Sequence, residues 1–71
     1  MTEIPIRGDM IRLGQLLKLS GLADDGVHAK AILARGVVRV NGTAEDRRGR
    51  QLHPGDAINV DGQHLLVVAS D

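Results

Sequence analysis

The chain has 71 residues, with 42% hydrophobic and 25% charged residues, no cysteine and no aromatic residue. This length predicts one domain over residues 1–71 and excludes an enzyme with an interdomain cleft, while the composition excludes disulfides, thiolate metal sites and base stacking on aromatic rings. There is no apolar run of the roughly 20 residues that span a bilayer, and residues 1–9 lack the apolar core of a secretory signal, so we expect a cytoplasmic protein.

The formal charges cancel overall but are unevenly distributed along the chain. Residues 26–55 hold six basic and two acidic residues, whereas residues 56–71 hold three acidic residues and no Lys or Arg. A basic middle segment favours an acidic partner more than the neutral total suggests.

The N-terminal half predicts one strand and two helices. Residues 3–6 alternate polar and apolar and contain Pro5, which is tolerated in an edge strand. Residues 11–20 have helical periodicity, and Gly21 ends that helix. A second helix is expected from a cap at Asp24 or Asp25 to about Arg35, with an apolar stripe formed by Ala29, Ile32 and Leu33.

The C-terminal half predicts two hairpins. The first joins residues 37–40 to residues 43–45 through Asn41-Gly42, and the second joins residues 57–60 to residues 63–68 through Asp61-Gly62. Between them, residues 46–51 form a basic loop and residues 53–56 a turn. We therefore expect an α+β domain in which two short helices pack on a small antiparallel sheet of two hairpins plus a short N-terminal strand.

No catalytic or metal-binding constellation is apparent. His28, His53 and His64 lack metal-ligand spacing and are interpreted as surface or turn residues, and Asp24-Asp25 is interpreted as a helix cap. No phosphate-loop glycine motif is present. We expect neither enzymatic activity nor a cofactor.

The basic residues are the remaining functional signal. Arg47, Arg48 and Arg50 place three guanidinium groups in four residues, and each group is suited to binding a phosphate with paired hydrogen bonds. Arg39 and Lys30 extend this set if hairpin and helix pack together. A solvated charge run is an equally open interpretation, with Glu45 and Asp46 neutralising part of the cluster.

Five short motifs occur in an order that resembles the S4-type RNA-binding domain, and more narrowly the bacterial single-domain YbcJ/YaaA subfamily. They are L-x-Q-x-L-K, G-x-x-A-K, G-x-V-x-V-N-G, R-R-G and G-D, and the resemblance covers about residues 4–68. It implies an alpha-L motif, in which two helices and a loop bind structured RNA such as ribosomal or transfer RNA. It also implies association with the ribosome. The matched RNA-contacting positions are Arg12, Lys18, Lys30, Arg47, Arg48, Arg50 and, in a mainly structural role, Asn41.

Three positions depart from the family pattern. Gly14, Gly26 and Gln51 stand where an acidic residue and two basic residues are frequent. These departures leave the expected fold intact and reduce the expected RNA affinity. A protein-interaction module, using strand addition at residues 3–6 or the basic patch, is the alternative function.

Overall fold

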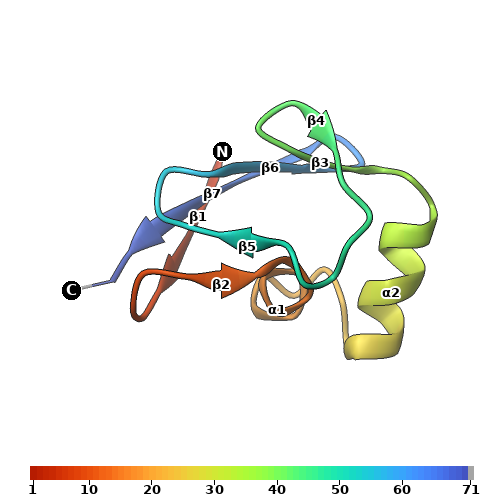
Figure 1. Cartoon of the computed structure of the whole chain (residues 1–71), viewed down its shortest axis with the longest axis horizontal. Coiled ribbons are helices and arrows are strands. Elements are labelled where there is room, and N and C mark those ends of the chain that lie inside the picture. The colour runs from red at the N-terminus through yellow and green to blue at the C-terminus, as the bar shows by residue number, and fades with distance from the viewer. Residues whose placement is uncertain (71) are drawn as a thin grey trace.

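The computed structural model describes residues 1–70 and contains two helices among short strands (Figure 1). Helix α1 spans Leu13–Leu19 and α2 spans Gly26–Ala34. The strands are β1 (Thr2–Ile6), β2 (Ile11–Arg12), β3 (Val38–Val40), β4 (Thr43–Ala44), β5 (Gln51–Leu52), β6 (Ala57–Val60) and β7 (Gln63–Ala69). Neither helix has the length and apolarity that crossing a membrane requires.

The main sheet has the strand order β1-β7-β6-β3-β4. The two predicted hairpins are confirmed as antiparallel pairs, β3 with β4 and β6 with β7, and β3 joins them by pairing with β6. The N-terminal strand β1 adds to this sheet at its edge, parallel to β7, so the five-stranded sheet is mixed. The predicted α+β class is confirmed.

The start of the first helix differs from the sequence-based prediction. Residues 11 and 12 were expected in the helix, but they form β2, which pairs antiparallel with β5 in a separate two-stranded sheet. Gln51 was expected in a loop and belongs to β5. Local periodicity identifies neither strand, because each is two residues long and its partner is distant in the chain.

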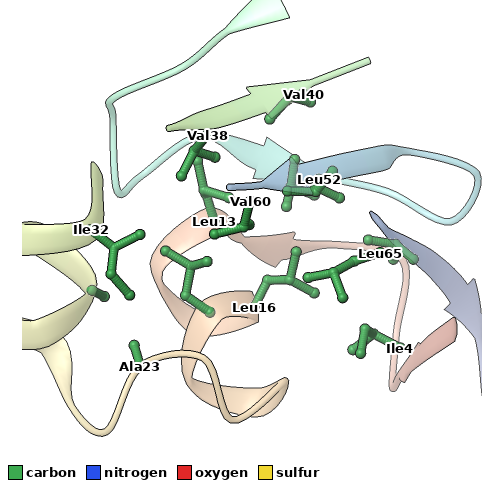
Figure 2. Packing of buried hydrophobic residues seen from close by; sticks show 14 of the residues in the cluster. Ile4, Leu13, Leu16, Ala23, Ile32, Val38, Val40, Leu52, Val60 and Leu65 are labelled. Atoms are coloured by element: carbon green, nitrogen blue, oxygen red, sulfur yellow. The ribbon is translucent and has the colours of Figure 1, made fainter. Parts of the chain in front are cut away.

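The hydrophobic core lies between one face of the main sheet and the two helices (Figure 2). Val38, Val40 and Val60 project from the sheet toward Leu13 and Leu16 of α1. The predicted α2 stripe of Ala29, Ile32 and Leu33 is also buried. Burial of each large aliphatic side chain contributes about 1.5–3 kcal/mol, and the shared core fixes both helices relative to the sheet.

Local signals place the turns and the second helix as predicted. Asn41 and Asp61 have φ of 50°, and each precedes a glycine with positive φ, as two-residue hairpin turns require. The side chain of Asp25 caps α2 by accepting a hydrogen bond of 2.8 Å from the backbone N–H of His28. These features fix the ends of the elements that carry the basic residues.

Candidate nucleic-acid interface

The basic loop, predicted over residues 46–51, spans residues 45–50 in the structure, between β4 and β5. Three consecutive carbonyl groups join it to the start of α1. The carbonyl of Arg48 accepts from Gly14 N at 3.0 Å, and that of Arg50 accepts from Leu13 N at 2.8 Å. The carbonyl of Gly49 accepts from Arg12 Nη1 at 3.2 Å. Backbone N–H groups at a helix start otherwise lack partners, so the loop both completes α1 and is held in place by it.

This docking creates an open hollow between the loop, α1 and α2. The hollow, which we call the basic hollow, has a volume of about 480 Å³ and is lined by Arg12, Gly14, Gln15, Lys18, Gly26, Ala29, Arg48 and Gly49. Three cationic side chains from three segments meet there, and none of the lining residues is acidic. The hollow therefore favours an anionic group.

Glycines form much of the surface against which Arg48 lies. A Cβ atom at Gly14 would lie 3.5 Å from Arg48 Cβ, and one at Gly26 would lie 3.9 Å from Arg48 Nη1. An alanine therefore fits at either position, whereas a longer side chain at residue 26 would compete with the Arg48 guanidinium for space. Two of the three departures from the family pattern thus adjoin the same arginine.

The two other loop arginines are paired with Glu45, whose side chain is 7% exposed. Arg47 Nη2 and Arg50 Nη1 lie 3.0 and 2.9 Å from Glu45 Oε1, and Arg47 Nε donates to Oε2 at 3.1 Å. Hydrogen bonds from Arg47 and Arg50 lower the pKa of Glu45 from 4.5 to about 2. The neutralisation of part of the basic run by Glu45 is confirmed.

The remaining predicted contact residues lie outside the hollow. Lys30 is exposed on α2, one turn after Gly26 and on the same flank of the helix. Arg39 is exposed in β3 between buried Val38 and Val40, so it lies on the sheet face opposite the core. The sheet therefore separates Arg39 from the helices.

Asn41 has a structural role in the turn after β3. Its Nδ2 donates to Asp56 Oδ1 at 3.1 Å, and its Oδ1 accepts from Ala57 N at 2.9 Å. These bonds tie the first hairpin to the start of β6. Both polar ends of the side chain already have protein partners.

Sequence reasoning did not include Gln15 among the contact residues, although it lines the basic hollow. Its Oε1 accepts a hydrogen bond of 3.1 Å from Arg12 N. The spacing was an available signal, because Gln15 lies three residues after Arg12 and three before Lys18, on one helix face.

Comparison with known proteins gives a consistent assignment. A family model described as "S4 domain" matches residues 4–68. The chain is 42% identical over 59 residues to "Probable ribosome maturation protein RlbA" of Bacillus subtilis (strain 168), covering 83% of each chain. It is 36% identical over 59 residues to "Putative RNA-binding protein YbcJ" of Escherichia coli (strain K12), covering 83% of this chain and 84% of that protein.

A solved structure shares the fold. The crystal structure of the 30S ribosomal protein S4e from Thermoplasma acidophilum superposes with a TM-score of 0.61 at 26% sequence identity. The match covers 80% of this chain and 30% of that ribosomal protein. The likeness therefore concerns one part of the larger protein.

Proposed function

The chain belongs to the S4 domain family, and on this premise we propose that it binds structured RNA through the basic hollow. The observation that carries the proposal is the meeting of Arg12, Lys18 and Arg48 in a hollow with no acidic lining residue. Lys30, exposed on the adjoining flank of α2, extends the contact surface.

The composition limits how RNA is recognised. The chain has no Phe, Tyr or Trp, and so lacks the large aromatic side chains that usually serve as platforms for base stacking. Arginine and lysine instead bind phosphate oxygens, which position an RNA without reading its sequence. We therefore propose recognition of the shape and backbone of a folded RNA.

We propose ribosomal RNA as the target class and a ribosome-associated role in the cytoplasm. The name of the Bacillus relative refers to ribosome maturation, and the structural neighbour is a ribosomal protein, which supports this choice over transfer RNA. We propose a binding role without catalysis, since the hollow offers cations but no paired acid and base.

A binding titration at several salt concentrations tests the proposal. Three to four phosphate contacts predict that log affinity falls with log salt at a slope of about −2 to −3.5. We expect Arg48→Gln and Lys18→Gln each to weaken binding to ribosomal RNA. Arg35→Gln is the matched control, because Arg35 pairs with Asp61 at 3.5 Å and does not line the hollow.

Transfer RNA serves as the competing ligand in the same assay. Tighter binding of transfer RNA than of ribosomal RNA would overturn the choice of target class. A folded protein that binds neither RNA at low salt would overturn the proposed function.

Strand addition is the second candidate, because β1 lies at an edge of the main sheet. Ile4 and Ile6 are buried, so replacing either one tests the core rather than the edge. A protein partner that binds the Arg48→Gln variant as well as it binds the unmodified protein would support this candidate.

A further inference from the structure

The carboxylate of Glu45 is held by five hydrogen bonds within its own loop. Oε2 accepts from the backbone N–H groups of Asp46 and Arg47 at 3.1 and 3.2 Å and from Arg47 Nε at 3.1 Å. Oε1 accepts from Arg47 Nη2 at 3.0 Å and from Arg50 Nη1 at 2.9 Å. One side chain thus contacts two backbone N–H groups and two arginine side chains of the loop.

We propose that Glu45 is a positioning residue for RNA binding, which fixes the loop so that Arg48, rather than Arg47 or Arg50, is the loop arginine that contacts phosphate. The inference rests on the proposed function and divides the three arginines by role. Arg47 and Arg50 hold the loop through Glu45, and Arg48 lines the basic hollow.

The loop is anchored at both ends around this carboxylate. At its start, the backbone N–H of Glu45 donates to the carbonyl of Val38 in β3 at 3.0 Å. At its end, the carbonyls of Arg48 and Arg50 accept from the start of α1. Arg48 therefore lies on a backbone held by the sheet, by the carboxylate and by a helix.

The loop arginines also differ in whether a carboxylate neutralises their charge. Arg47 and Arg50 are each within 3.0 Å of the Glu45 carboxylate, which offsets their attraction for a phosphate. In residues 1–70, no carboxylate lies within ion-pair distance of Arg48. A phosphate entering the hollow thus meets Arg48 without having to displace an existing partner.

The change in RNA affinity on Glu45→Gln distinguishes positioning by Glu45 from a simple effect of its charge. Glu45→Gln removes a negative charge beside an RNA-binding surface, so electrostatics alone predicts tighter binding. If Glu45 positions Arg48, the same change weakens binding. Asp46→Asn is the matched control, because it removes the adjacent negative charge and leaves the Glu45 carboxylate in place.

The experiment measures ribosomal RNA affinity for the full chain and its variants, with circular dichroism as the check on folding. We expect Glu45→Gln to weaken binding about tenfold, the order of one lost charge-assisted contact, and Asp46→Asn to leave binding equal or tighter. Binding by Glu45→Gln that equals or exceeds that of the unmodified protein would overturn the proposal and leave RNA binding intact. Absence of binding by the unmodified protein would overturn the proposed function and this inference together.

A double-mutant cycle separates positioning from general loss of structure. Arg48→Gln should cost much less affinity in the Glu45→Gln background than in the unmodified protein, whereas Lys18→Gln should cost the same in both. Equal costs for Arg48→Gln in both backgrounds would contradict the proposal.

The salt dependence of a double variant keeps the proposal testable if Glu45→Gln does not fold. Arg48→Gln should reduce the salt slope by about 0.7–0.9, one phosphate contact, and adding Arg47→Gln to it should reduce neither the slope nor the affinity much further. A second reduction of that size in the double variant would show direct phosphate contact by Arg47 and overturn the division of roles.

Discussion

Acidification tests the ion pairs of Glu45 independently of RNA. The pKa of Glu45 is about 2 in the folded protein, mainly through hydrogen bonds from Arg47 and Arg50, compared with 4.5 when unperturbed. Because the folded-state value is the lower one, the pairing stabilises the protein fully above pH 4.5. That contribution is lost as the pH falls from 4.5 toward 2.

The size of the effect follows from the difference between the two pKa values. At about 1.4 kcal/mol per pH unit, the lowering to about 2 sets an upper limit of about 3 kcal/mol. The Arg47 side chain is 71% exposed, and solvent screening weakens its share. We therefore expect Glu45 to account for about 1–2 kcal/mol of the stability lost on acidification.

Urea unfolding followed by far-ultraviolet circular dichroism provides the assay, since the chain has no tryptophan or tyrosine to report by fluorescence. The free energy of unfolding is measured at pH 6 and at pH 2.5 for the unmodified protein and for Glu45→Gln. The unmodified protein should lose about 1–2 kcal/mol more than the variant between the two pH values. Asp56, whose pKa is also lowered, titrates in both proteins and cancels in the difference. Equal losses in the two proteins would refute the reasoning.

Three further predictions concern the scaffold and are read by the same urea assay. Leu16→Ala should lower the free energy of unfolding by about 2–5 kcal/mol, because the side chain is fully buried between sheet and helices. Asp25→Ala should cost about 1 kcal/mol through loss of the α2 cap, whereas Asp24→Ala, which leaves that hydrogen bond in place, should cost less. Gly42→Ala should cost about 1–2 kcal/mol because residue 42 has φ of +86°, and an unchanged stability would contradict the assigned turn.

Most of the scaffold was predictable because its signals are local. The Asn41-Gly42 and Asp61-Gly62 turns each require positive φ, and both hairpins formed where these pairs stand. Helical spacing likewise identified the buried stripe of α2, because the residues of the stripe lie within one short segment of the sequence. The β2–β5 pair was missed because its stability depends on contacts between distant segments.

The candidate site was predictable only in part. The sequence showed a basic run but not which arginines Glu45 would neutralise, since that depends on the path of the loop. The convergence of Arg12, Lys18 and Arg48 also depends on the docking of that loop onto α1. Charge distribution thus indicated the class of ligand, and tertiary structure determined which cations come together.

The parallel pairing of β1 with β7 has a consequence for how the chain folds. The register pairs Thr2 with Leu65 and Ile6 with Ala69. The backbone hydrogen bonds of β1, near the start of the sequence, therefore form only when β7, near its end, is in place. Such long-range pairing closes a large loop and slows folding relative to local hairpins. In the main sheet β1 pairs only with β7, so β1 cannot join the sheet before β7 is available. Until then Ile4 and Ile6, buried in the finished protein, remain exposed to solvent and to aggregation.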